Sequence, residues 1–458
     1  MSTAAVHAHR RALAIGLVLA VTTFAFDSLS IAAAMPAIVD DLGGVSLYGA
    51  AFSAFMIADV LSLAVAGPVA DRRGPAPVLA AGLGLFATGL VIGGAAPTMS
   101  VVVVGRFVQG LGAGTIGSTA YVVVSRVWSD HERARMFAVL SGAWIVPSLV
   151  APAAAGVVAD ALSWRLVFLG LLPFPVVAAA LALGPLRELG PAAPELVGDG
   201  VVRTRVALGS RLAFGVLLIV LGLERDVFPI AAALLVAGVV IAYPAFRTLM
   251  PAGTLRAATG LPAVVISRLL LSWAFFGTDA FIPLLVTGVH GESTRVGGLA
   301  LTAAGLSWSA AAWGQSHLMK TRSETFLVGG GTVLIAAGIG AVAFALSSDA
   351  PVWLVFVGWA LGGAGMGFAA NTTSVGAMAR ADKGEEGSTT SAFQLADFLG
   401  VALATGLGGA IVAAGDRGGW DQSTTLGLVF ALTAAAIVPC FAASRRIGYP
   451  PVTARPSL

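Results

Sequence analysis

Several charged side chains stand inside long apolar stretches of this sequence. Arg106 lies within VGRFVQGLGAG (104–114), and the other members of the set are Asp27, Asp59, Arg268, Asp279 and Asp397. A charged side chain at the centre of a membrane helix costs about 3 kcal/mol on insertion scales, so such residues mark sites of function or of charge pairing. A buried carboxylate can take up a proton, whereas a nearby arginine favours its charged form. The set therefore predicts a site where proton and cation compete for buried carboxylates.

Arg106 shares one face of its predicted helix with a row of glycines. At 3.6 residues per turn, it falls within about 80° of Gly110, Gly114 and Gly117. Glycines admit a close neighbouring helix or a cavity. Counted from the outer ends of their helices, Asp27 and Arg106 lie at depths that agree to about one turn, so Asp27 is the predicted partner. In the alternative interpretation, Arg106 is paired with a carboxylate only for assembly, and Asp59 and Asp279 are polar contacts between helices.

The residues around these charges predict an all-α, polytopic membrane protein. The chain is 57% hydrophobic and 11% charged, against about 45–50% and about 25% in soluble globular proteins. A membrane helix needs about 20 residues, and the first apolar run is too long for the core of a signal peptide. The sequence predicts fourteen spans, at 12–36, 46–70, 77–96, 100–125, 136–159, 165–186, 207–223, 227–246, 262–287, 296–316, 325–347, 351–378, 388–414 and 424–443. Arg211 interrupts the span at 207–223, so its uninterrupted apolar stretch, from Arg211 to Glu224, is the shortest of the set.

Positive charge is concentrated on one side of the predicted helices. With both termini in the cytoplasm, most of the 26 lysines and arginines fall at cytoplasmic ends, and those on the outer side are Arg165, Arg225, Arg295 and Arg417. This distribution follows the positive-inside rule. Together with abundant arginine and alanine, it predicts a multi-pass protein of a bacterial cytoplasmic membrane.

The sequence contains an internal repeat. Gly105, Gly110, Gly112 and Gly114 recur at one constant spacing as Gly358, Gly363, Gly365 and Gly367, and Trp359 stands where the first copy has Arg106. Asp27 recurs as Asp279 at a spacing one residue shorter. The glycine pattern and the aspartate recur in different helices at nearly one spacing, which predicts two parallel six-helix lobes. Transporters use this arrangement for alternating access. The predicted domains are an N-terminal lobe (1–186), a cytoplasmic loop (187–205), an inserted two-helix hairpin (206–256) and a C-terminal lobe (257–458).

With these features the chain resembles the major facilitator superfamily, and within it the fourteen-span drug:proton antiporters, over nearly its whole length. GPVADRRG (67–74) is similar to the family's Gly-x-x-x-Asp-Arg-x-Gly loop between spans two and three, although PAP (75–77) replaces the further basic residues usual there. The resemblance implies a cytoplasmic gate in which the glycines allow a tight turn and the charged side chains form a latch; its residues are Gly67, Asp71, Arg72, Arg73 and Gly74.

GRFVQG (105–110) resembles the Arg-x-x-x-Gly motif of the family's fourth span. Quaternary-ammonium exporters of this family have acids in spans one, two and thirteen together with that arginine. The resemblance implies roles in proton coupling or substrate binding for the matching residues and for the repeated acid in span nine, namely Asp27, Asp59, Asp397, Arg106 and Asp279. LVAPAAAG (149–156) departs from the family's span-five antiporter motif, with Ala151 and Ala155 at two glycine positions, which weakens the support for export over import. WRLVF (164–168) resembles the segment that enters span six.

We consider a further set of residues, most of them aromatic or flexible, as candidates to line an apolar substrate cavity. The candidates are Gln109, Gly110, Trp144, Trp273, Trp308, Trp313, Trp359, Met56 and Met366. Each tryptophan or methionine could equally face lipid or fill a helix interface.

The sequence lacks the residues that other functional classes require. Cys440 is the only cysteine, which excludes a disulfide framework and a cysteine-based metal site. Neither of the two lysines, Lys320 and Lys383, follows a glycine as an ATP-binding Walker A loop requires. The net charge of +3 does not suit a nucleic-acid partner. We expect no enzyme activity, no cofactor and no ATPase subunit. The expected protein is a monomeric, proton-coupled exporter of amphipathic, cationic compounds, the alternatives being a dedicated exporter of a metabolite, natural product or lipid, and a metabolite importer.

Overall fold

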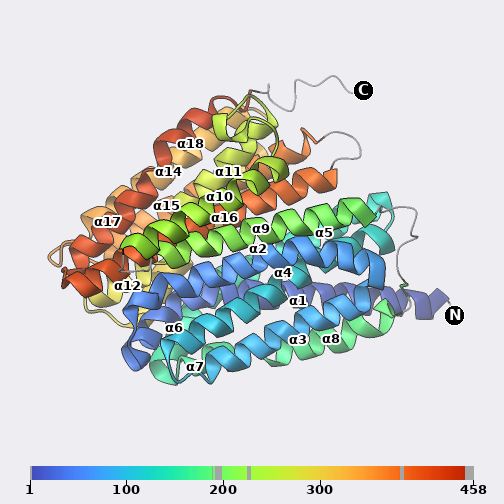
Figure 1. The fold of residues 1–458 in the computed structure, drawn as a ribbon, viewed down its shortest axis with the longest axis horizontal. Helices are drawn as coiled ribbons and strands as arrows, with labels where there is room; N and C mark the ends of the chain where they lie inside the picture. Colours follow the sequence, from blue (N-terminus) through green and yellow to red (C-terminus); the bar gives the residue numbers. More distant parts are fainter. Residues whose placement is uncertain (1–2, 188, 191–198, 224–227, 382–385, 449–458) are drawn as a thin grey trace. The chain divides into compact units, whose positions relative to one another are not determined.

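The computed structural model of the protein describes residues 3–187, 189–190, 199–223, 228–381 and 386–448, and all regular structure in these ranges is helical (Figure 1). The helices of the first part of the chain are α1 (Thr3–Leu42), α2 (Tyr48–Arg73), α3 (Pro75–Gly94), α4 (Met99–Val127), α5 (Asp130–Gly142), α6 (Ile145–Ala161), α7 (Arg165–Leu169), α8 (Pro173–Leu186), α9 (Asp199–Leu223) and α10 (Phe228–Leu249). Those of the second part are α11 (Leu261–Asp279), α12 (Ile282–Gly288), α13 (Thr294–Leu318), α14 (Glu324–Phe344), α15 (Trp353–Met378), α16 (Glu386–Gly418), α17 (Gln422–Ala434) and α18 (Ile437–Ser444). Short 3-10 turns occur at Val45–Leu47 and Thr254–Arg256.

The chain divides into two compact units. Unit 1 contains residues 1–44, 54–218 and 237–245, and unit 2 contains residues 45–53, 219–236 and 246–458. Helices α2, α9 and α10 contribute residues to both. Within unit 1, α1 packs on α6 and α8, and α3 packs along α4; within unit 2, α15 packs on α13 and α14, and α11 packs on α16. α9 begins at Asp199, inside the range 187–205 for which we expected a loop.

Within the described ranges, twelve helices are long and apolar enough to cross a membrane. They include α1, whose single helix runs through the whole first predicted span, and the α9 segment at 206–223. Two predicted spans are not among the twelve. The span at 136–159 is divided between α5 and α6, and α6 has only 17 residues, while the span at 296–316 corresponds to α13, which has the necessary length but too polar a composition.

The segment GPVADRRG is helical, which corrects part of our expectation. α2 continues to Arg73, and only Gly74 makes the turn, with a φ of 86° that favours glycine, before Pro75 begins α3. Gly67 lies inside α2, where an added Cβ would be 3.1 Å from the hydroxyl oxygen of Ser118 on α4. The second glycine of the motif therefore allows the turn, whereas the first allows two helices to approach.

The glycines of α4 bring neighbouring backbones into contact, as the sequence predicted. A methyl group on Gly110 would collide with the carbonyl of Phe55 on α2, and one on Gly112 would collide with the backbone of Phe86 on α3. The repeated glycines do the same in unit 2. A methyl group on Gly363 would strike the carbonyl of Ala304 on α13, and one on Gly365 that of Gly331 on α14. The two copies of the glycine pattern thus serve the same packing in each unit.

Candidate functional site

Arg106 and Asp27 form a buried ion pair in unit 1, which confirms the predicted contact. Nη1 of Arg106 donates to Oδ2 of Asp27 at 2.5 Å, and the two side chains are 1% and 4% exposed. Gln109 lies one turn after Arg106; its Nε2 donates to Asp27 Oδ1 at 2.9 Å and its Oε1 accepts from Arg106 at 3.2 Å. The guanidinium also lies over the ring of Phe55, 4.2 Å from its centroid. Carboxylate, amide and ring thus enclose a single permanent positive charge.

Asp59 lies one turn after Phe55 on α2, on the face that α4 approaches. A methyl group on Gly114 would collide with the carboxylate of Asp59 and the hydroxyl of Ser62, so the glycine makes room for this polar group. Asp59 is 5% exposed, and its carboxylate makes no hydrogen bond or ion pair to any residue that the structure describes. The described residues of unit 1 therefore include one buried carboxylate with a cation, Asp27, and one without, Asp59.

Asp279 in unit 2 has a neutral donor in place of a cation. The indole Nε1 of Trp359 donates to Asp279 Oδ1 at 2.7 Å, and Trp359 is fully buried. Asp279 repeats Asp27 and Trp359 repeats Arg106 in the sequence, so each unit places an N–H donor from the same repeat position against the same repeat acid. The sequence showed that the acid is kept and that Trp359 replaces Arg106, but it did not predict this contact.

Asp397 is paired with the second intramembrane arginine. Nη2 of Arg268 on α11 donates to Asp397 Oδ2 on α16 at 2.6 Å, the hydroxyl of Ser272 donates to Oδ1, and the guanidinium lies over the ring of Phe393. The two charged side chains are 12% and 18% exposed. Of the four intramembrane aspartates, two are thus balanced by arginine.

The aromatic cavity candidates occupy different environments. Trp308 and Trp359 belong to one cluster in unit 2, described below, and Trp273 donates to the carbonyl of Leu432. Trp144 is 38% exposed and packs edge-on against Phe24 in unit 1, while Trp313 is 72% exposed. Met366 is fully buried and Met56 half-buried.

The gate motif has a partner that sequence reasoning missed. Nη2 of Arg126, near the end of α4, donates to Asp71 Oδ1 at 2.5 Å, whereas Arg72 and Arg73 are exposed. An anion at the C-terminal end of a helix is disfavoured by the helix dipole, and Arg126 supplies the compensating charge. The sequence contained one signal for this ion pair, because positive charge is expected at the cytoplasmic end of span four. Unit 2 has a corresponding buried pair between Glu324 at the start of α14 and Arg380 after α15, at 2.8 Å.

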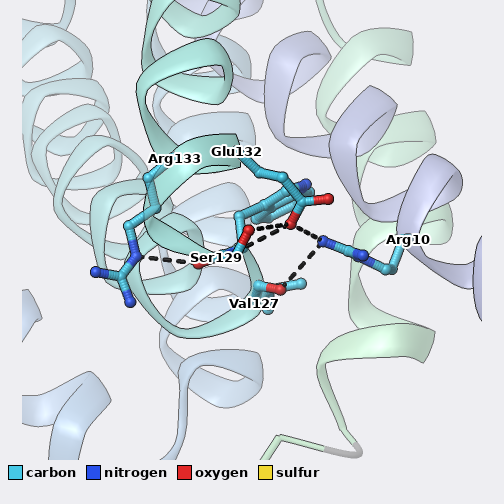
Figure 2. Close-up of polar contacts among 6 residues, drawn as sticks. Arg10, Val127, Ser129, Glu132 and Arg133 are labelled. Atoms are coloured by element: carbon cyan, nitrogen blue, oxygen red, sulfur yellow. Dashed lines mark hydrogen bonds and ion pairs between the residues drawn. The ribbon is translucent and has the colours of Figure 1, made fainter.

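A second unpredicted contact connects α1 to the beginning of α5 (Figure 2). Nη2 of Arg10 donates to Glu132 Oε2 at 2.8 Å, and the same oxygen accepts from the backbone N and the hydroxyl of Ser129 at 3.1 and 3.0 Å. Ser129 directly precedes α5, and Glu132 stands three residues later, the spacing of a capping box. Hydrogen bonds from Arg10 and then from Ser129 lower the pKa of Glu132 to about 2.

We expect this contact to withstand mild acid and to depend on Arg10. A depressed carboxylate pKa gives a contribution that is complete above the ordinary value and is lost as pH falls towards about 2. Arg10→Gln should raise hydrogen exchange of the amides at 127–133 roughly two- to fivefold at pH 7, the range for an exposed ion pair. Hydrogen exchange read by mass spectrometry measures this, with exposed Arg11→Gln as the matched control. Equal exchange in both variants would leave Glu132 as a helix cap alone.

The described residues contain no group of three His, Cys, Asp or Glu side chains that could hold a metal ion. The described acids inside the membrane-spanning helices are instead single carboxylates. Each has an arginine, an indole or no described partner. Such an arrangement can bind and release protons or cations.

The family model of the Major Facilitator Superfamily matches residues 15–405. The chain therefore belongs to this superfamily of membrane transporters and is a multi-pass membrane protein, not an enzyme.

Similar proteins agree with that assignment. The chain is 24% identical to a probable multidrug-efflux transporter of Mycobacterium tuberculosis (strain ATCC 25618 / H37Rv) across 95% of each sequence. It is 27% identical to the multidrug transporter protein MdtP of Bacillus subtilis (strain 168) over 66% of this chain, and that match spans only 57% of the relative. Among solved structures, a POT family transporter in complex with 5-aminolevulinic acid is similar in fold, with a TM-score of 0.69 and 15% identity over 95% of this chain and 97% of that one.

Proposed function

We propose that this protein is a proton-coupled multidrug exporter of amphipathic, cationic compounds. The unequal partners of the buried acids support this proposal most directly. Arg106 balances Asp27, while Asp59 of α2, which packs against Gly114 on the same face of α4 as Arg106, has no partner among the described residues. An unpaired buried charge is costly, so binding and release of a proton or a cation is the chemistry that this part of unit 1 favours.

The relatives support the direction and substrate class of transport. Two proteins similar to this chain are named as multidrug transporters, one of them matching along nearly its whole length. We propose fourteen spans: the twelve apolar helices, the combined α5–α6 segment and α13. The positive-inside distribution supports a bacterial cytoplasmic membrane with both termini inside. We further propose a monomer that uses protons and small molecules as its partners, and alternating access between lobes at 1–186 and 257–458, with the inserted hairpin 206–256 between them in the sequence.

Everted membrane vesicles provide the test. Cells that express the protein are broken to give inside-out vesicles, which are energised to acidify their interior. If a drug is exchanged for protons, adding ethidium should cause protons to leave, measured as recovery of an acid-quenched dye, in vesicles with the protein but not in vesicles without it.

The companion measurement is ethidium accumulation in intact cells with and without a proton uncoupler. We expect expression to lower accumulation and the uncoupler to abolish the difference. Export that is insensitive to the uncoupler would reject proton coupling. Absence of export for several cations and neutral dyes would favour a dedicated exporter of a metabolite or lipid, or an importer.

A further inference from the structure

We infer that Asp279, with the aromatic side chains beside it, is the binding site for the positively charged nitrogen of an organic cation. The inference rests on the proposed export of cationic compounds and assigns their recognition to unit 2. Its basis is the difference between the two copies of the internal repeat.

The first copy shows how the protein itself holds a cation at this position. In unit 1 the guanidinium of Arg106 contacts the carboxylate of Asp27 and lies over the ring of Phe55. In unit 2 the repeat acid is Asp279, but the repeat position of the arginine is occupied by Trp359, which donates a neutral N–H. The second copy therefore retains the anion and the aromatic surroundings, while no described residue supplies a positive charge to balance them.

Asp279 differs in this respect from the other intramembrane acids. Asp27 and Asp397 are paired with arginines, and Asp59 is buried against Gly114. Asp279 is half-buried, and no described residue forms an ion pair with it. Arg268 lies eleven positions earlier on α11, about 16 Å along the helix axis, and is committed to Asp397. Asp279 is thus the accessible acid whose charge a ligand could balance.

Aromatic rings surround Asp279 on its own helix and on two neighbours. Phe275 and Phe276 precede it by about one turn of α11, so they lie on the same face. Phe275 stacks on Trp359 with ring centroids 4.8 Å apart, and Trp308 of α13 packs edge-on to Phe275 at 5.4 Å. Phe275 and Trp359 are buried, whereas Phe276 and Trp308 are half-buried. A carboxylate beside half-buried aromatic rings is the chemistry that recognises quaternary ammonium groups.

The backbone at this point also favours a cation. α11 ends at Asp279, and the chain turns through Ala280 and Phe281 before α12 begins, with Pro283 unable to donate a helical hydrogen bond. The C-terminal end of a helix carries partial negative charge, and broken membrane helices place such ends at cation sites in transporters. The hydroxyl of Tyr48 donates to the carbonyl of Ala280 at 3.0 Å and satisfies one of the groups at the break.

Binding to the purified full-length protein in lipid nanodiscs tests the inference. The probes are ethidium and tetraphenylphosphonium, which are permanently charged, and the uncharged dye Nile red. Asp279→Asn should raise the Kd of both cations roughly a hundredfold, as expected for loss of one partner of a buried charge pair, and leave Nile red unchanged. Asp349→Asn, which alters an exposed aspartate of the same unit, is the matched control and should bind like the wild type.

Aromatic variants keep the inference testable if Asp279→Asn does not fold. Trp308→Leu should weaken cation binding about three- to thirtyfold and Trp308→Phe less, in line with cation–π energies. Trp353→Leu, which alters an exposed tryptophan at the start of α15, should have no effect. Wild-type affinity for the cations in Asp279→Asn, an equal loss for Nile red, or no binding of any cation to the wild type would each overturn the inference.

The binding assay is independent of the vesicle assay. If cations bind through Asp279 but their export is insensitive to an uncoupler, proton coupling fails and the inference stands. If Asp279→Asn binds and exports ethidium as the wild type does, with export still sensitive to the uncoupler, the inference fails and the proposed function stands.

Discussion

Asp27→Asn is expected to abolish uphill ethidium export while the protein still inserts in the membrane. The variant removes the carboxylate whose charge Arg106 and Gln109 stabilise, so the site can no longer alternate between a protonated and a charged form. Cells that express the variant should accumulate ethidium to the level of cells without the protein. Membrane insertion is checked by the amount of variant that survives detergent extraction and gel filtration.

A double variant separates chemistry from assembly. Asp27→Asn alone leaves the guanidinium of Arg106 buried and unpaired, which costs about 3–5 kcal/mol when a buried pair is broken. In Asp27→Asn with Arg106→Gln, both charges are removed and amide groups of similar size remain. We expect this protein to recover its thermal stability but not its export. If export returns with stability, the pair is a structural contact and Asp27 takes no part in coupling.

Gly110→Ala is expected to destabilise the protein more than a glycine-to-alanine change elsewhere on α4. The added Cβ would collide with the backbone carbonyl of Phe55 and with the Cβ of Ala58, so α2 must move away. Forced overpacking of this kind costs about 1–3 kcal/mol. The same displacement shifts the ring of Phe55 away from the Arg106 guanidinium, so export should fall together with stability.

Gly117→Ala is the matched control on the same helix. Gly117 has open space around an added Cβ, and alanine is favoured over glycine in a helix by about 1 kcal/mol. We expect its melting temperature in detergent, followed by gel filtration after heating, to equal or exceed that of the wild type. Gly363→Ala in the second repeat should behave like Gly110→Ala, since it would strike the carbonyl of Ala304. Equal stability of Gly110→Ala and Gly117→Ala would mean that α2 and α4 separate without cost.

The local sequence was sufficient for twelve of the fourteen predicted spans, for the repeated glycine pattern and for one buried contact. Long apolar runs determine membrane helices because the backbone must satisfy its own hydrogen bonds in lipid, and the twelve apolar helices of the structure lie where such runs were found. The pairing of Asp27 with Arg106 could be predicted because a buried arginine requires an anion and few acids lie at its depth. The close packing at Gly110 and Gly114 likewise followed from glycines on one helical face.

Tertiary structure alone decided which donors meet which acids. Asp71 forms an ion pair with Arg126 because α2 and α4 end next to each other. The sequence showed only the arginines that are adjacent to Asp71 in the motif. Gly67 packs against α4 although its motif predicted a turn. Trp359 was grouped with the apolar cavity candidates, yet its indole N–H is directed at Asp279. The type and order of residues determine what each side chain can donate or accept. The packing of distant helices determines where that group points, so Asp27 meets an arginine whereas Asp279 meets an indole and forms no ion pair with any described residue.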